Sequence, residues 1–336
     1  MLEEFNMPAP ESESNSQRKP GKAKLQALKQ STQLSQKKAL REEQRNASLS
    51  KKEKARGSKL GLKEPQNSRP GAKRKRKTNS LSLLFQLTRR EISNRYRGSF
   101  FGVLWSIITP ILMLAIYSFV FGIVFPSKWA VDGDSPQPGR FAVILFSGLI
   151  LFQVFSEVVT RAPLLIVQNS AFVKRIVFPL ELLVPVALFA ALFHACVSFL
   201  ILLPFAWWQF GPLSSTIVYL PLIVLPFCFM IIGFGWLLAS LGTYIRDISQ
   251  IMGTITTALM FLAPIFFPLE VLPDWIRPVL TFNPLTIPIE ELRNVTLFAQ
   301  PPDVVRLGIY SGAALMIAVL GFAWFRATRR GFADVL

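Results

Sequence analysis

Long apolar stretches follow one another from residue 100 towards the end of the chain. A helix needs about 20 predominantly apolar residues to cross about 30 Å of hydrocarbon. The 64 residues between Glu181 and Arg246 contain no Asp, Glu, Lys or Arg, and the Trp, Gly and Pro residues at 207–212 divide them into two spans. The pattern predicts an all-α polytopic membrane protein with six transmembrane helices, at about residues 100–125, 141–160, 182–206, 214–241, 248–268 and 306–326.

Residues 81–98, ahead of the first predicted span, combine apolar and basic positions at helical spacing. Leu84 and Phe85 fall along one side of the helix, and arginines fall along another. The density of arginine disfavours the alternative that these residues only lengthen the first span. We expect an amphipathic interface helix, with basic residues toward lipid headgroups or a partner and an i,i+4 pair between Glu91 and Arg95. Its candidate functional residues are Arg89, Arg90, Glu91, Arg95, Tyr96 and Arg97.

The segment between the second and third spans is amphipathic and too charged to cross the membrane. Asn169 or Ser170 can cap a short helix that begins at Ala171, and Pro179 would end it. Such a helix, at about residues 169–180, can dock a mixed basic and aromatic surface into a groove of another protein. A solvated connecting loop explains the composition equally well, so both interpretations stay open.

The connection between the fifth and sixth spans, residues 264–303, is rich in proline yet largely apolar. A plain external loop would be more polar. Short helices that are broken by proline and dip part-way into the outer leaflet fit better, because irregular backbone at that depth is tolerated only against protein or a water-filled cavity. We therefore predict outer re-entrant helices that form an exit or gate.

The basic charge of the chain lies mostly ahead of its apolar part. The 336 residues carry a formal net charge of +17, and residues 1–80 hold 21 of the 37 Lys and Arg but 8 of the 20 Asp and Glu. This tail has one aromatic residue, Phe5, and cannot bury enough apolar surface to fold, so we expect it to be mostly disordered. Its basic run at 73–77 suits anionic lipid better than nucleic acid, because neither interleaved aromatic residues nor a nucleic-acid-binding module accompanies the run.

The distribution of Lys and Arg over the loops predicts the orientation. With the N-terminus inside, most basic loop residues fall on the cytoplasmic side even when the tail is left out of the count. We predict a multi-pass protein of the cytoplasmic membrane with both termini in the cytoplasm. The chain then consists of a cytoplasmic tail, residues 1–80, and one membrane domain, residues 81–336.

Residues that usually carry chemistry are sparse. The sequence has no GxxxxGK[ST] phosphate loop and therefore no P-loop ATPase site of its own. His194 is the only histidine, and without an acidic partner in its span a packing or hydrogen-bonding role is favoured over a proton relay. The adjacent Glu290 and Glu291 are weak as a catalytic carboxylate pair, and helix-start charges or a pairing with Arg293 are the favoured interpretations. We expect no enzyme active site, no cofactor and no metal site in this chain.

Four segments resemble, in the right order, the membrane subunits of ABC transporters with a type-2 transmembrane domain. The resemblance is to exporters of polysaccharide and polyol phosphate such as O-antigen, capsule and teichoic acid. The segments are REISNRYRGSFFGVLWSIITPILMLAIYSFVFGIVF at 90–125, NSAFVKRIVFPLE at 169–181, Asn283-Pro284-Leu285 with Glu290 and Arg293, and GFADV at 331–335. The resemblance covers residues 81–336, and the long basic tail departs from the family pattern.

The resemblance implies a homodimer, bound to two copies of a separate ATPase subunit that holds ATP and Mg, and a lipid-linked glycan as substrate. Residues 169–180 would be a coupling helix in a cleft of the ATPase. The implied coupling residues are Asn169, Phe172, Lys174, Arg175, Phe178 and Glu181. The implied outer gate residues are Asn283, Pro284, Glu290 and Arg293. Aromatic rings can stack on sugar faces, which makes Trp105 and Tyr117 candidates for lining a channel.

The sequence therefore predicts the permease subunit of an ATP-dependent exporter of lipid-linked polysaccharide, in the inner membrane of a bacterium. One alternative is a type-2 permease for small lipophilic drugs. Another is a membrane anchor that binds nucleic acid through its basic tail, although nucleic acid is not an expected partner. Deleting the tail separates the last two classes, because export would largely survive the deletion and tethering would not.

Overall fold

The computed structural model describes Lys38 and residues 41–48, 80–120, 138–173, 178–269 and 272–336. The chain divides into two units, Met1–Arg76 and Lys77–Leu336, and each is described by itself. In the first unit, residues 41–48 form helix, and all their side chains are exposed.

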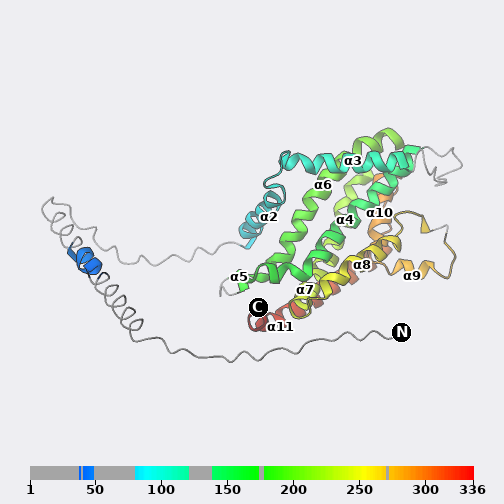
Figure 1. The fold of residues 1–336 in the computed structure, drawn as a ribbon. Coiled ribbons are helices and arrows are strands. Elements are labelled where there is room, and N and C mark those ends of the chain that lie inside the picture. The colour runs from blue at the N-terminus through cyan, green and yellow to red at the C-terminus, as the bar shows by residue number, and fades with distance from the viewer. Residues whose placement is uncertain (1–37, 39–40, 49–79, 121–137, 174–177, 270–271) are drawn as a thin grey trace, which may run out of the picture. The chain divides into compact units, whose positions relative to one another are not determined.

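The described elements of the second unit are all helical (Figure 1). Short 3-10 turns join several of the α-helices, at Gly102–Leu104, Leu180–Leu182, Ser215–Tyr219 and Arg329–Gly331. The α-helices are α2 (Ser80–Tyr96), α3 (Trp105–Phe119), α4 (Pro138–Gln168), α5 (Ser170–Val173), α6 (Leu183–Phe210), α7 (Leu220–Tyr244), α8 (Ile248–Phe261), α9 (Arg277–Thr281), α10 (Thr286–Thr296), α11 (Val304–Thr328) and α12 (Phe332–Val335).

Five helical segments among the described residues are long and apolar enough to cross a membrane. The prediction of an all-α chain with several spanning helices is therefore confirmed for the described residues, and the count of six remains a prediction. Helix α8 has 14 residues, about 21 Å at 1.5 Å per residue, and is too short to cross the hydrocarbon unaided. The five segments are Gly102–Phe119, Gly139–Gln168, Leu180–Phe210, Ser215–Tyr244 and Val304–Val335.

Helix α4 is the centre of the bundle. In its apolar window 72% of the residues are buried, compared with 17% to 33% in the other four segments. It packs against α3, α6, α7, α8 and α10, while α7 packs along α11. The contact between α7 and α11 depends on small residues, since a Cβ atom at Gly233 would lie 2.6 Å from the Ile317 carbonyl oxygen.

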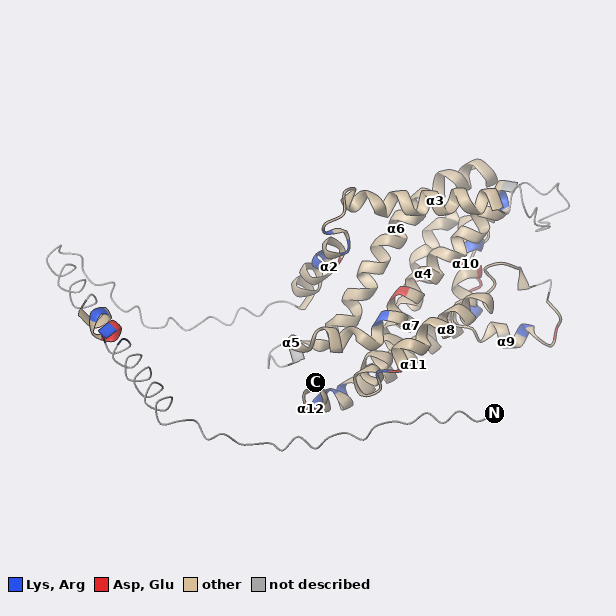
Figure 2. Cartoon of the chain, viewed as in Figure 1, with Lys and Arg blue, Asp and Glu red and all other residues tan. Residues whose placement is uncertain are grey.

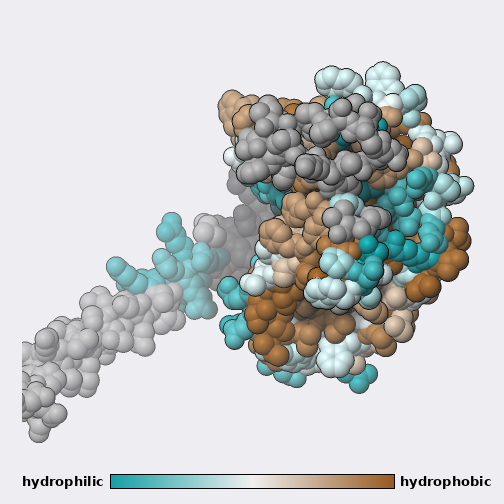
Figure 3. Space-filling model, turned by 90° about the vertical axis from the view of Figure 1, so that its right-hand side faces the viewer, coloured by the Kyte–Doolittle hydropathy of each residue, from teal (hydrophilic) through white to brown (hydrophobic). Residues whose placement is uncertain are grey.

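The other spanning helices leave much apolar surface uncovered (Figure 3). Helix α3 exposes Ile107, Ile111 and Ile116, and α11 exposes Ile309 and several other large apolar residues. An exposed apolar area of this extent marks contact with lipid or with another protein. The surface is therefore that of a membrane-embedded chain, in agreement with the sequence pattern.

The ends of the bundle carry the short helices and most of the charge. Helices α2, α5 and α12 lie toward one end, and α9 and α10 lie toward the other (Figure 1). Charged residues are absent from residues 182–245, which include α6 and α7 (Figure 2). The chain turns from α2 into α3 at Gly98 and Gly102, which have φ angles of 87° and 51° that favour glycine.

Candidate functional site

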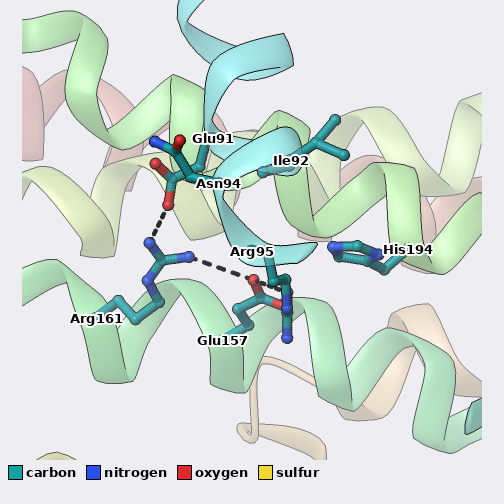
Figure 4. A pocket seen from close by; sticks show the side chains of 8 residues that line it. Glu91, Ile92, Asn94, Arg95, Glu157, Arg161 and His194 are labelled. Carbon is teal, nitrogen blue, oxygen red and sulfur yellow. Dashed lines mark hydrogen bonds and ion pairs between the residues drawn. The ribbon is translucent and has the colours of Figure 1, made fainter. Parts of the chain in front are cut away.

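Two pairs of charged residues interlock helix α2 with helix α4. Glu91 and Arg95 lie one turn apart on α2, and Glu157 and Arg161 lie one turn apart on α4. The Arg95 guanidinium donates to Glu157 at 2.6 Å, and Arg161 donates to Glu157 at 3.4 Å and also to Glu91 (Figure 4). Each carboxylate therefore faces an arginine of the other helix, so the four groups form one alternating network.

This ionic network fastens α2 to α4, in addition to the packing of α2 along α6. The Glu157 side chain is 11% exposed, while the arginine side chains are 44% and 39% exposed. Burial by itself lowers the pKa of Arg95, but its hydrogen bond to Glu157 and the charge of that carboxylate outweigh burial and raise the pKa above the usual value. The guanidinium is therefore held in its charged form.

A second contact joins α2 to α6. The Tyr96 hydroxyl and Nδ1 of His194 lie 3.1 Å apart, and the two rings meet edge to face at 5.6 Å. His194 thus serves as a hydrogen-bonding residue, and its buried Nε2 has no hydrogen-bond partner among the described residues. His194 also lines a cavity of about 420 Å³ together with Ala190, Glu91, Ile92, Asn94, Arg95, Glu157 and Arg161 (Figure 4).

The network contains two residues that the sequence did not single out as functional. Glu157 lies near the end of the predicted second span, and Arg161 directly follows that span. Their signal is the i,i+4 spacing, which matches that of Glu91 and Arg95 with the same order of charge. Helix α4 continues beyond the predicted end of the second span at residue 160 and reaches Gln168.

The expected interface-helix residues fall into three groups. Glu91, Arg95 and Tyr96 make the contacts with α4 and α6. Arg89 and Arg97 line a separate groove beside the turn into α3, whereas Arg90 lines neither this groove nor the cavity beside His194.

The expected coupling segment begins at the end of α4. The Asn169 side-chain amide donates to the Leu165 carbonyl at 2.9 Å, and α5 starts at the next residue. Lys174 and Arg175 lie outside the described residues, and the side chain of Phe172 is not among those described.

Hydrogen bonds fasten the last residues of the expected coupling segment to the bundle. Arg329, at the C-terminal end of α11, donates to the Glu181 carboxylate at 2.8 Å and to the Phe178 carbonyl at 3.0 Å. The Trp236 indole of α7 donates to the Glu181 carbonyl at 3.0 Å. The end of the expected coupling segment is thus tied to α7 and α11.

The expected outer gate residues are packed into the opposite end of the bundle. Arg293 of α10 is 3% exposed, and its guanidinium donates to three backbone carbonyls, at 3.2 Å, 2.5 Å and 3.0 Å, of Ile144, Pro264 and Ile265. Burial lowers the pKa of Arg293 to about 10, so the guanidinium stays charged at neutral pH. This arginine holds α10 and the segment after α8 against α4.

The neighbouring candidates make similar tethers. Asn283 donates to the Leu259 carbonyl at 3.0 Å, and the Pro284 carbonyl accepts a hydrogen bond from Tyr310 at 3.1 Å. Glu290 forms an ion pair with Arg306 at 2.6 Å. These contacts fasten the segment between α8 and α11 to both helices.

The two channel candidates on α3 differ in environment. Trp105 is 39% exposed and contacts the Phe101 ring edge to face at 5.7 Å. Tyr117 is partly buried against the core. Trp105 is therefore the more accessible of the two.

These features define a polytopic helical membrane protein with an amphipathic helix fastened beside its first span. Within the described residues, no group of three His, Cys, Asp or Glu side chains gathers to hold a metal ion. A family model for ABC-2 type transporters matches residues 82–297, and the chain belongs to this family.

Curated relatives agree with this membership. An O-antigen export system permease protein of Klebsiella pneumoniae is 23% identical over 256 residues, which cover 76% of this chain and 95% of the relative. A protein of the same description from Myxococcus xanthus is 23% identical, with 75% and 94% covered. A polysialic acid transport protein of Escherichia coli is 27% identical over 241 residues, with 70% and 90% covered.

Proposed function

We propose that this chain is the permease subunit of an ATP-dependent exporter that moves a lipid-linked polysaccharide, such as an O-antigen or capsule chain, across the inner membrane of a bacterium. The observation that carries the proposal is the similarity to relatives named for O-antigen export and polysialic acid transport, each covered over at least 90% of its length. Both termini would be cytoplasmic, which puts α2, α5 and α12 at the cytoplasmic end.

The transporter would be a homodimer bound to two copies of a separate ATPase subunit, which would hold ATP and Mg. The exposed side of α3 supports a second copy, because only 17% of the residues in the Gly102–Phe119 window are buried within this chain. Helix α8 adds polar groups to exposed positions, at Gln250, Thr254 and Thr257. Since polar side chains are unfavourable against lipid, these positions support a hydrated path beside α8, and Trp105 of α3 is a separate candidate for a channel lining.

Coupling would begin at residues 169–180. Lys174 and Arg175 would pair with acidic groups of the ATPase, while Phe172 and Phe178 would supply apolar contacts. A movement of this segment would be transmitted to α4, which ends where the segment begins. It would also be transmitted to α7 and α11, through the hydrogen bonds that Trp236 and Arg329 donate to Glu181.

Helix α2 would move together with the expected coupling segment. Its partners Glu157 and Arg161 lie on α4, about two to three and a half turns before the point where the expected coupling segment begins. A rotation or shift of this end of α4 would therefore change the ionic network directly. ATP binding can favour one arrangement of the spanning helices over another only if contacts such as these differ between the two arrangements.

The experiment reverses both central charges of the coupling segment, by Lys174→Glu with Arg175→Glu. We expect ATP hydrolysis to continue while surface polysaccharide is lost, because the ATPase can no longer engage the permease productively. The matched control reverses two exposed tail arginines, by Arg41→Glu with Arg45→Glu, and should leave export largely intact. Normal export by the first variant would overturn the coupling assignment, and loss of export by the control would favour a function of the tail.

A further inference from the structure

A groove of about 600 Å³ lies between α2, the turn into α3, and α6. Its size is within the range of small-molecule sites, about 300 to 1,000 Å³. On the α2 side of the groove, Arg89 and Ser93 lie one turn apart on one face of the helix, and Arg97 directly follows its last residue, Tyr96. The opposite wall is apolar and includes Val103 and Phe193.

The two arginines of the groove differ from the other arginines at this end of the bundle. Arg95 and Arg161 are paired with carboxylates, as is Arg329. Within the described part of the chain, Arg89 and Arg97 have no side-chain hydrogen bond or ion pair. An anion in the groove would therefore meet two guanidinium groups that have no competing carboxylate.

The position of the groove determines the kind of ligand that can reach it. The first spanning segment begins at Gly102, and Gly102 and Val103 line the groove, so the groove opens at the level of the lipid headgroups. Beyond it, exposed apolar residues of α3 continue into the bilayer, including Val103, Leu104 and Ile107. A ligand with an anionic head and an apolar tail matches both parts of this surface.

We propose that the groove binds one anionic phospholipid of the membrane. The Arg89 and Arg97 guanidinium groups bind the phosphate oxygens, and an acyl chain packs on Val103 and Phe193. The bound lipid packs against α2, a helix in which no residue is fully buried by the chain itself. This binding requires neither ATP nor the transported molecule.

Native mass spectrometry of the purified full chain in detergent tests the proposal, with phosphatidylglycerol and phosphatidylcholine of identical acyl chains as probes. We expect phosphatidylglycerol to be retained and phosphatidylcholine to be lost. Each basic residue near anionic lipid is worth about fivefold in affinity, so Arg89→Gln with Arg97→Gln should weaken phosphatidylglycerol binding about 30-fold. The charge-preserving pair Arg89→Lys with Arg97→Lys should retain most of it.

Arg90→Gln is the matched control, since Arg90 is an exposed arginine of the same helix that does not line the groove. It should change phosphatidylglycerol binding by less than twofold. Equal loss in Arg90→Gln and Arg97→Gln would overturn the proposal in favour of a diffuse basic surface. Unchanged binding by the double glutamine variant, or equal retention of both lipids, would also overturn it. The readout is lipid binding alone, so either result leaves the proposed transport function to its own test.

Discussion

Neutralising Glu157 should loosen α2 without unfolding the bundle. In Glu157→Gln, one change weakens the contacts at 2.6 Å to Arg95 and at 3.4 Å to Arg161. A hydrogen bond to a charged group contributes about 1.5–3 kcal/mol, whereas exposed ion pairs contribute about 0–1 kcal/mol. Glu157 is 11% exposed but its partners are about half-exposed, so about 2 kcal/mol is a reasonable middle value.

A loss of about 2 kcal/mol shifts the balance between docked and undocked α2 about 30-fold. Because a lone helix of this length is marginal in water, undocking should expose the backbone amides of residues 81–96 to exchange. Hydrogen exchange measured by mass spectrometry, on the purified chain in nanodiscs, should show exchange of these amides faster by about the same factor. Protection of α7 and α11 should not change, because opening of α2 is local.

The control is Glu181→Gln, which also removes a carboxylate that accepts from an arginine, here Arg329 at 2.8 Å. It should leave exchange of α2 unchanged. The double variant Arg95→Gln with Glu157→Gln should cost less than the sum of the two single variants, because the two groups share one contact. If exchange of α2 in Glu157→Gln equals that of the unmodified chain, the reasoning about the ionic network is refuted.

Two further substitutions test the packing of the bundle. Arg293→Met leaves the three carbonyls that this side chain now satisfies without their donor, and should reduce the free energy of unfolding by about 3 kcal/mol or more; a thermal unfolding midpoint equal to that of the exposed control Arg326→Met would contradict this. Gly233→Ala places a Cβ atom 2.6 Å from the Ile317 carbonyl oxygen and should lower the unfolding midpoint. Gly312→Ala, where a Cβ atom meets nothing within 4 Å, should not lower it, and equal midpoints for the two alanine variants would count against close packing of α7 and α11.

Local signals in the sequence account for the helices. The uncharged run after Glu181 predicts two spans, and the structure has α6 and α7, with α6 ending where Gly211 adopts a φ of 88°. The expected fifth span was longer than the observed α8, because apolar composition continues past Phe261 while the helix does not. Apolar composition shows that a segment can lie in the membrane, but it does not show where a helix ends. Here Pro264 and the turn before it end α8.

Contacts between distant segments were beyond the reach of one sequence. Glu157 and Arg161 are charged residues at the end of an apolar run, and nothing local shows that they meet a helix about 60 to 70 residues earlier. Arg293 was expected in an outer gate, but the three carbonyls that surround it come from two other parts of the chain. The sequence shows that such residues are charged, but their ion-pair and hydrogen-bond partners are known only from the fold.

Transport in a reconstituted system tests the central proposal most directly. Proteoliposomes would contain this chain together with its ATPase subunit, and a labelled lipid-linked polysaccharide would be presented on the side that carries the ATPase. The account predicts that the label crosses the membrane only when ATP is supplied and hydrolysed, and that Lys174→Glu with Arg175→Glu abolishes the crossing while hydrolysis continues. Crossing that needs no ATP, or hydrolysis with no crossing by the unmodified chain, would contradict it.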